Sequence, residues 1–247
     1  EDVNEMLKMD KYIDLIIPRG GNALVKYIQE NTKIPVMGHA SGICHIYADE
    51  TTDIQKSVNI CLDAKIQYPS ACNAVETILI NKNILEDFLP ELVKAFEDNN
   101  VTIKADEECR RICKNLEPAE KEDWAAEYGD KTVSIKAVKD IFDAIAHINI
   151  YGSGHTDCIL SKNPGNIELF MNLVDSAGVF ANASTRFADG FRYGLGAEVG
   201  ISTNKTHARG PVGLEGLTIY KYKLYGNGQI AGEYCSGEKH FKHERLI

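Results

Sequence analysis

Helix-like and strand-like patterns alternate along most of this 247-residue chain, and that alternation decides the fold class. Short apolar runs typical of buried strands are each followed by a segment with the apolar spacing of a helix. The predicted strands are residues 12–17, 34–37, 43–47, 76–80, 101–104, 132–138, 156–161 and 178–182, and the predicted helices are residues 22–30, 51–67, 85–97, 107–116, 139–148 and 166–174. This order predicts an α/β fold with a mostly parallel sheet.

The pattern changes after residue 182. Residues 183–216 are rich in glycine and carry charged residues, so they form either a ligand-contacting loop or a mobile surface loop. Residues 217–225 then alternate apolar and polar side chains, as an exposed or partner-paired strand would. We expect one face of this strand to be buried and the face that carries the lysines to be exposed to solvent. The buried face would carry Thr218, Tyr220, Tyr222 and Leu224.

Composition excludes several classes of partner. A net charge of −9 argues against nucleic acid or an anionic membrane as the main partner. There is no membrane-spanning apolar run and no signal-peptide core at the start, so a cytoplasmic location is expected. The seven cysteines have no regular spacing and no CxxC pair, which indicates reduced thiols. Cys44-His45 and His155–Cys158 lack a second paired motif, so no metal site is predicted.

Cys72 is the candidate nucleophile. It follows a Pro69-Ser70-Ala71 turn, between a predicted helix and a predicted strand. A thiol on a tight turn is accessible to a substrate, and its thiolate is a strong nucleophile. The alternative is a buried structural cysteine, because free cysteine often packs as a small hydrophobic residue.

Two further segments are candidates for binding a cofactor. The turn formed by Pro18, Arg19, Gly20 and Gly21 lies between a predicted strand and a predicted helix, where a helix N-terminus and an arginine attract phosphate. An ordinary βα turn is the alternative. Glu127, just before the strand at 132, is placed to accept hydrogen bonds from ribose hydroxyls, or else it is a solvated surface acid.

A third candidate segment follows the strand at 178–182. It contains Ser184, Thr185, Arg186 and Asp189. Ligands bind at the carboxyl ends of strands in open α/β sheets, and an arginine can pair with a carboxylate or phosphate in two hydrogen bonds. A structural ion pair between Arg186 and Asp189 is the alternative.

Four motifs together resemble one known family. They are residues 69–77 (Pro-Ser-Ala-Cys-Asn-Ala-Val-Glu-Thr), 127–129 (Glu-Tyr-Gly), 182–203 (from Asn-Ala-Ser-Thr-Arg-Phe-Ala-Asp-Gly to Gly-Ile-Ser-Thr) and 207–217 (His-Ala-Arg-Gly-Pro-Val-Gly-Leu-Glu-Gly-Leu). The chain resembles, from about residue 13 to 226, the γ-glutamyl phosphate reductases, or glutamate-5-semialdehyde dehydrogenases, of the aldehyde dehydrogenase superfamily. The reductase half of bifunctional pyrroline-5-carboxylate synthase carries the same motifs.

The resemblance implies an aldehyde-dehydrogenase-like fold. It would comprise part of a Rossmann-type cofactor domain (1–56), a catalytic domain (57–189), a segment returning to the cofactor domain (190–210) and an oligomerisation strand with a tail (211–247). The chain would then begin inside the cofactor domain. It would form a homo-oligomer and work with a glutamate 5-kinase, fused or separate. A mitochondrial location would apply to a eukaryotic bifunctional enzyme.

The resemblance also implies an activity: NADPH-dependent reduction of L-glutamyl 5-phosphate to L-glutamate 5-semialdehyde, with release of phosphate, in proline biosynthesis. Cys72 matches the nucleophile, residues 18–21 the pyrophosphate turn and Glu127 the ribose-side acid. The substrate residues would be Asn73, Ser184, Thr185, Arg186 and Asp189. Hydrolytic relatives use a glutamate base where this chain has Val36-Met37-Gly38-His39, and its absence suits an enzyme that must preserve a thioester. The alternatives are another aldehyde dehydrogenase with a different acyl substrate, or an inactive structural part of a larger enzyme.

Overall fold

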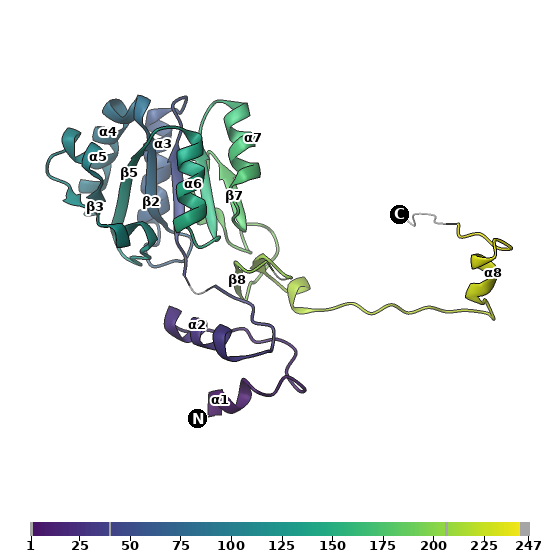
Figure 1. The fold of residues 1–247 in the computed structure, drawn as a ribbon. Coiled ribbons are helices and arrows are strands. Elements are labelled where there is room, and N and C mark those ends of the chain that lie inside the picture. The colour runs from purple at the N-terminus through teal and green to yellow at the C-terminus, as the bar shows by residue number, and fades with distance from the viewer. Residues whose placement is uncertain (1, 40, 206, 243–247) are drawn as a thin grey trace. The chain divides into compact units, whose positions relative to one another are not determined.

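A seven-stranded parallel sheet forms the core of residues 44–181 (Figure 1). The computed structural model describes residues 2–39, 41–205 and 207–242. The strands are β1 (Cys44–Ala48), β2 (Val75–Asn81), β3 (Thr102–Ala105), β4 (Glu117–Pro118), β5 (Thr132–Val138), β6 (Thr156–Leu160) and β7 (Gly178–Ala181). Their order is β4-β3-β5-β2-β1-β6-β7, and every neighbouring pair is parallel. The predicted α/β class is therefore confirmed.

Helices cover both faces of the sheet, which explains why β1, β2 and β6 are buried along their whole length. One face packs on α3 (Ile54–Ile66), α4 (Leu85–Glu97) and α5 (Glu107–Ile112), and the other on α6 (Ile141–Tyr151) and α7 (Pro164–Leu173). Successive residues of β1 alternate between the two cores, with Ile46 in the first and Tyr47 in the second.

Short polar side chains start the helices that cover the sheet. Asp53, Asp106, Asp140 and Asn163 each accept a hydrogen bond from a backbone N–H of the first turn of α3, α5, α6 and α7. The sequence favoured Thr51 or Thr52 as the cap of α3, but Asp53 takes that role. The predicted helix 107–116 is also too long, because α5 ends at Ile112 and the chain then forms β4.

The segment before β1 departs from the prediction. It contains α1 (Asp2–Met6) and α2 (Asn22–Asn31), packed around Leu7, Ile16, Ile28 and Ile34. The strands predicted at 12–17 and 34–37 are wrong as strands, because the two segments share only one parallel bridge, between Ile16 and Val36. Two short segments without further strands beside them cannot extend a ladder.

The glycine-rich region after β7 is ordered into a hairpin. β8 (Gly200–Ser202) pairs antiparallel with β9 (Gly210–Val212). Two contacts tie this region to the chain before β1: Ile201 O accepts from His39 Nδ1 at 2.7 Å, and Asn204 Nδ2 donates to Val36 O at 2.8 Å. This stretch therefore contains a short hairpin that contacts the N-terminal segment, and it is not a loop throughout.

Residues 218–242 belong to a second unit, which begins at Thr218 and contains the short helix α8 (Ala231–Cys235). The strand predicted at 217–225 is wrong within this single chain: Leu217 ends a 3-10 helix and the residues after it have no regular structure. The face expected to be buried is exposed at Tyr220, Tyr222 and Leu224. A strand needs a neighbour for its backbone hydrogen bonds, and no described strand pairs with these residues. Among the described helices, none combines the length and apolar character needed to cross a membrane.

Candidate active site

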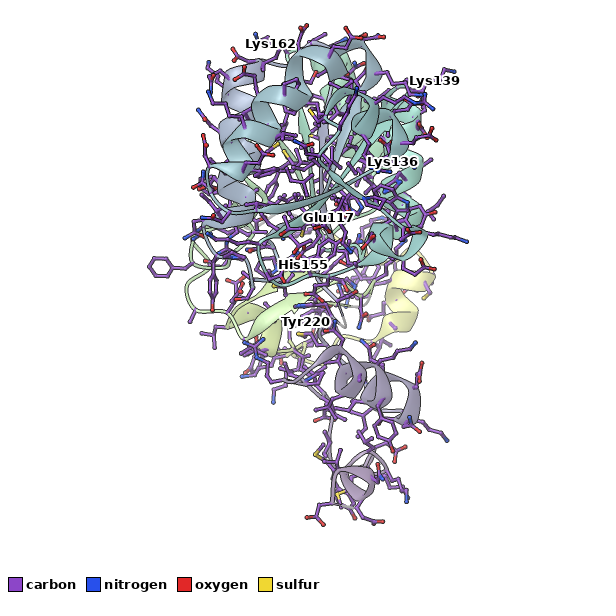
Figure 2. All side chains as sticks on the ribbon, turned by 90° about the vertical axis from the view of Figure 1, so that its left-hand side faces the viewer. Glu117, Lys136, Lys139, His155, Lys162 and Tyr220 are labelled. Carbon is purple, nitrogen blue, oxygen red and sulfur yellow. The ribbon has the colours of Figure 1, made fainter. Side chains whose placement is uncertain are left out.

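The predicted site residues gather at the amino edge of the sheet, where the strands begin. Among the predicted residues, Cys72 and Asn73 precede β2 and Glu127 precedes β5; His155, which was not predicted to have a role, precedes β6. Figure 2 shows the two edges through the residues that flank β6, with His155 at one edge and Lys162 at the other. The candidate segment at residues 184–189, expected at the carboxyl ends of the strands, lies at the opposite edge beside Asn73.

A reversal of the chain explains this difference. Asn182 follows β7 in the left-handed region, with φ of 53°, and its side chain bonds Ser161 at the carboxyl edge. The next residues fold back toward the amino edge. There Thr185 Oγ1 donates to Asn73 O at 2.7 Å, and Asn73 Nδ2 donates to Ala188 O at 2.8 Å. The predicted substrate segment thus lies beside Cys72.

The Cys72 thiol is half-buried on a tight turn. Ala71 N donates to Tyr68 O and Ala74 N to Ala71 O, so two successive turns fix the cysteine between α3 and β2. Gly42, just before β1, packs directly on it, and a Cβ at that position would lie 2.3 Å from Cys72 O. Cys44, Cys61, Cys109 and Cys158 are buried, so they are less accessible to a substrate than Cys72. The buried-cysteine alternative fits those four better than Cys72.

The surroundings of Cys72 favour its neutral form. Burial raises the pKa of the Cys72 thiol to about 11, and the carboxylates of Glu198 and Glu127 add to that rise. Its own backbone N–H and the Arg186 guanidinium act in the opposite direction. Nucleophilic attack by this sulfur therefore needs a proton acceptor or a bound group that changes the local charge.

Two histidines lie against the thiol. One ring nitrogen of His39, one of His155 and the Cys72 sulfur lie within 4.8 Å of one another. Burial lowers the pKa of His155 to about 3, and its Nε2 has no hydrogen-bond partner among the described residues. The sequence missed the trio because its members are brought together only by the sheet.

Arg186 lines a cavity of about 180 Å³ together with Asp63, Gln67, Phe187 and Arg192. Its Nε donates to Gln67 Oε1 at 2.8 Å, and its guanidinium lies 5.8 Å from the ring centre of Tyr68. No described carboxylate lies within ion-pair distance of it, which removes the alternative of a structural pair with Asp189. A largely buried guanidinium without a paired anion is suited to binding an anionic ligand.

Asp189 has a different environment. Its Oδ1 accepts from the backbone N–H of Arg192 at 3.1 Å, and Arg192 Nη1 donates to the carbonyl oxygen of Arg186. Ser184 caps the 3-10 helix Thr185–Phe187 through the N–H of Arg186. Ser184, Thr185 and Asp189 therefore shape the loop, while Arg186 and Arg192 present charge to the cavity.

The Pro18–Gly21 turn borders a second cavity, of about 80 Å³. Its walls include Arg19, Gly20, His39, Gly200 and Ser202. Helix α2 begins beside it without a side-chain cap, so its first N–H groups are available to an anion. Ser202 Oγ is buried and has no partner in the described chain. A basic residue, a helix N-terminus and an unpaired hydroxyl fit a phosphate or ribose group. No local pattern in the sequence pointed to Ser202.

Glu127 is hydrogen-bonded to Asn22, which borders this second cavity. Its Oε2 accepts from Asn22 Nδ2, in the first turn of α2, at 2.8 Å. The turn at residues 18–21 and the acid before β5 were identified as separate candidates in the sequence, and the fold brings them together at the start of α2. The contact also shows that Glu127 is not simply a solvated surface acid.

Comparison with known proteins first defines a class. No protein-family model matches the chain. A propionaldehyde dehydrogenase from Clostridium phytofermentans superposes with a TM-score of 0.63 at 19% identity, over 85% of this chain and 56% of the other. The fold is thus that of the aldehyde-dehydrogenase-like proteins.

More similar proteins narrow the class. The crystal structure of γ-glutamyl phosphate reductase from Thermotoga maritima superposes with a TM-score of 0.90 at 42% identity, over 92% of this chain and 55% of the other. Proteins of that name from Brachyspira hyodysenteriae and Acetivibrio thermocellus are 63% and 58% identical over 246 and 245 residues, and cover 100% and 99% of this chain. The chain spans 57% of the length of both relatives. The resemblance to the γ-glutamyl phosphate reductases is confirmed along the whole chain.

Proposed function

We propose that this chain carries the catalytic centre of a γ-glutamyl phosphate reductase, which reduces L-glutamyl 5-phosphate to L-glutamate 5-semialdehyde and releases phosphate in proline biosynthesis. One observation carries the proposal: the half-buried Cys72 thiol lies where the chain can bind anions. The Arg186 guanidinium lowers the pKa of that thiol, whereas the carboxylate of Glu127, which bonds the start of α2, raises it. An acyl phosphate is an anion with an electrophilic carbonyl carbon, which matches this combination.

In this mechanism the substrate binds with an anionic group against Arg186 and Arg192. The Cys72 sulfur attacks the acyl carbon, the bond to the phosphate oxygen breaks, and a thioester forms on the enzyme. The backbone N–H of Cys72 lies next to its own sulfur, where it is a candidate to stabilise the oxyanion. Such a donor contributes roughly 3 kcal/mol in comparable sites.

The reduction step needs a nicotinamide cofactor, and we propose NADPH. When bound, it supplies the hydride that converts the thioester to the aldehyde level. Arg19, Gly20 and Gly21 would hold a phosphate at the start of α2, and Glu127 would accept from a ribose hydroxyl. The cavity of about 80 Å³ has room for only part of a dinucleotide. We infer that residues 1–56 are part of a cofactor domain completed by chain that the relatives possess and this sequence does not span.

The activity is tested in reverse, by following NADP⁺ reduction with glutamate 5-semialdehyde and inorganic phosphate. We expect strict dependence on phosphate in a protein extended to the full length of its relatives. Turnover that requires coenzyme A instead would favour a different acylating aldehyde dehydrogenase. Turnover with water alone would favour a hydrolytic member. Activity in neither chain length would leave the structural-fragment alternative.

We also propose that residues 217–225 pair with a strand of another subunit. Their large side chains, including Ile219, Tyr220, Tyr222 and Leu224, are exposed in the single chain, and pairing would cover one face of them. Removing residues from Leu217 onward should convert an oligomer into monomers, measured by size-exclusion chromatography with light scattering. If the truncated protein keeps the same number of subunits, the interface lies elsewhere.

A further inference from the structure

Three side chains that reach the amino edge from separate parts of the chain form a histidine–cysteine trio: His39, Cys72 and His155. A ring nitrogen from each histidine and the cysteine sulfur lie within 4.8 Å of one another. The two imidazole rings meet edge to face, with their centres 5.2 Å apart. Only Cys72 has a role in the function proposed above, so the two histidines need an explanation.

The charges around Cys72 make a proton acceptor necessary. Glu127, Glu198 and the neighbouring thiol of Cys44 face it and disfavour a second negative charge, and Arg186 is the cation that opposes them. Burial is the largest cause of the raised pKa of Cys72, about 11. At neutral pH the sulfur therefore holds its proton, and attack on an acyl carbon requires its removal.

His155 is unsuited to accept that proton. It is fully buried, and its Nδ1 lies 2.9 Å from Thr156 Oγ1 and 3.7 Å from Cys44 Sγ. A charged imidazole there would be removed from water with no carboxylate as a partner. Its pKa, lowered to about 3 chiefly by burial, agrees with this geometry. His155 stays neutral and packs against the ring of His39.

His39 is suited to accept it. Its Nδ1 lies 2.7 Å from Ile201 O, and a carbonyl oxygen only accepts, so Nδ1 carries the hydrogen. Nε2 then has a free lone pair, because the partner of one ring nitrogen fixes the protonation of the other. His39 also borders the cavity that contains Arg19 and Ser202, and its ring is only half-buried. The Ile201 carbonyl would stabilise the imidazolium that forms.

We propose that His39 takes the thiol proton of Cys72 and holds it while the sulfur carries the acyl group. This rests on the function proposed above. The S–H bond breaks toward His39 Nε2, directly or through one water, as the sulfur bonds to the acyl carbon. Phosphate departs with the electrons of the C–O bond and takes a proton from solvent. After reduction, the aldehyde leaves, the electrons return to sulfur, and His39 returns the proton.

The arrangement gives a reason for a histidine where hydrolytic aldehyde dehydrogenases place a glutamate. A carboxylate next to the thioester can deprotonate water and hydrolyse the intermediate. An imidazole that already holds the thiol proton has no free lone pair and cannot do so. As long as His39 holds the thiol proton, this ring is not a base toward water beside the thioester.

The test measures Cys72 itself and needs neither substrate nor cofactor. Alkylation by iodoacetamide is followed in EDTA from pH 6 to 10 by mass spectrometry of the Cys72 peptide, in the parent and in His39→Gln. We expect the parent rate to contain a component that depends on His39 and is already present at neutral pH, where Cys72 alone would hold its proton. His39→Gln should lower the rate at pH 7.5 at least tenfold and leave a rate that rises in proportion to hydroxide. Added imidazole should restore part of the rate in His39→Ala.

Other cysteines control for unfolding in the same digest. Cys61 is buried and should stay unreactive in every variant, while Cys113 and Cys235 should react equally in all of them. A matched variant is His147→Gln, which changes another histidine without touching the trio. Equal Cys72 profiles in the parent and His39→Gln would overturn the proposal, even if the enzyme proves to be a phosphate-dependent reductase. A dependence on His39 without such reductase activity would instead refute only the proposed function.

Discussion

The two edges of the parallel sheet use polar side chains in opposite ways. At the carboxyl edge, Asp49, Thr51, Ser161, Asn166 and Asn182 form a carboxyl-edge network, in which these residues hydrogen-bond to one another. Asp49 accepts from Thr51 Oγ1 at 2.8 Å, Ser161 Oγ at 2.7 Å and Asn166 Nδ2 at 3.0 Å, and Asn182 bonds both backbone groups of Ser161. Each donor of this network has a partner inside the protein, so the edge contributes to stability and offers little to a ligand.

At the amino edge, buried polar atoms are left open. His155 Nε2, Asn73 Oδ1 and Ser202 Oγ have no hydrogen-bond partner among the described residues. An unsatisfied buried polar group costs free energy, roughly 1–3 kcal/mol each, unless a ligand or water completes it. The difference teaches that the proposed site lies where hydrogen bonds are left incomplete, at the edge opposite to the usual one in open α/β sheets.

The largest expected effect belongs to the amino edge. Cys72→Ser should lower turnover more than about 1,000-fold, because covalent catalysis is lost with the thiolate, while the fold changes little. The measurement is the phosphate-dependent reduction of NADP⁺ in a full-length protein, with circular dichroism for the fold. Cys113→Ser, at the end of α5, is the control and should keep its activity. A serine variant with more than about one hundredth of the parent rate would remove Cys72 from the mechanism.

Arg186 tests whether the open charge of the amino edge binds substrate. Arg186→Ala should raise KM or lower kcat by an amount equivalent to roughly 2–5 kcal/mol, the loss typical of a buried charge partner. Steady-state kinetics with varied semialdehyde and varied phosphate would identify which substrate group is affected. Arg111→Ala removes an exposed arginine on α5 and should leave both constants unchanged. Unaltered kinetics in Arg186→Ala would reduce this arginine to a structural role.

The carboxyl edge should respond in stability and not in rate. Asp49→Ala leaves Thr51, Ser161 and Asn166 without their shared acceptor, and we expect a loss of roughly 3 kcal/mol in the free energy of unfolding. Asn73→Ala, at the amino edge, removes one bond to Ala188 O and should cost only about 1 kcal/mol. Urea unfolding compares the two. The contrast between the edges fails if Asn73→Ala proves the more destabilising of the pair.

Local sequence signals predicted the sheet but not the edge at which the candidate site lies. Apart from β4, the helices and strands from β1 to β7 follow from apolar spacing within single segments, and Cys72 follows from one turn motif. The amino-edge location depends on Asn182, whose left-handed backbone returns the chain to Asn73, and a long-range reversal of this kind leaves little local signal.

The remaining differences have the same physical origin. His39, His155 and Ser202 are far apart in the sequence, and only the fold brings the first two together with Cys72 and the third into the neighbouring cavity. The strand predicted at 217–225 requires hydrogen bonds from another strand, which one chain does not provide. The segments 12–17 and 34–37 have the apolar pattern of strands, but they share a single bridge. An apolar pattern shows that a segment could form a strand. The segment becomes a strand only where a neighbouring strand pairs with its backbone hydrogen-bonding groups.

The smallest expected effect concerns acid, and the part of it that is due to histidine should arise near the amino edge, because the carboxyl-edge network contains no histidine. His147, near the end of α6, packs edge to face on His45 at 5.6 Å between ring centres, and burial lowers the pKa of His147 to about 3. Unfolding returns it to about 6.5, so the unfolded chain binds more protons between these values. Its contribution is therefore complete above pH 6.5 and is lost as the pH falls toward 3, by up to roughly 1.4 kcal/mol per pH unit.

His147→Phe isolates this dependence, because phenylalanine keeps a ring of similar size and does not titrate. Urea unfolding at pH 7.5, 6.0 and 5.0 gives the free energy of unfolding for the parent and the variant. Any packing loss shifts all three values equally, whereas the missing titration makes the variant's decline between pH 6.0 and 5.0 shallower by up to about 1.4 kcal/mol. Parallel declines would mean that His147 is charged in the folded protein, and the amino edge would then not be the acid-sensitive part of the sheet.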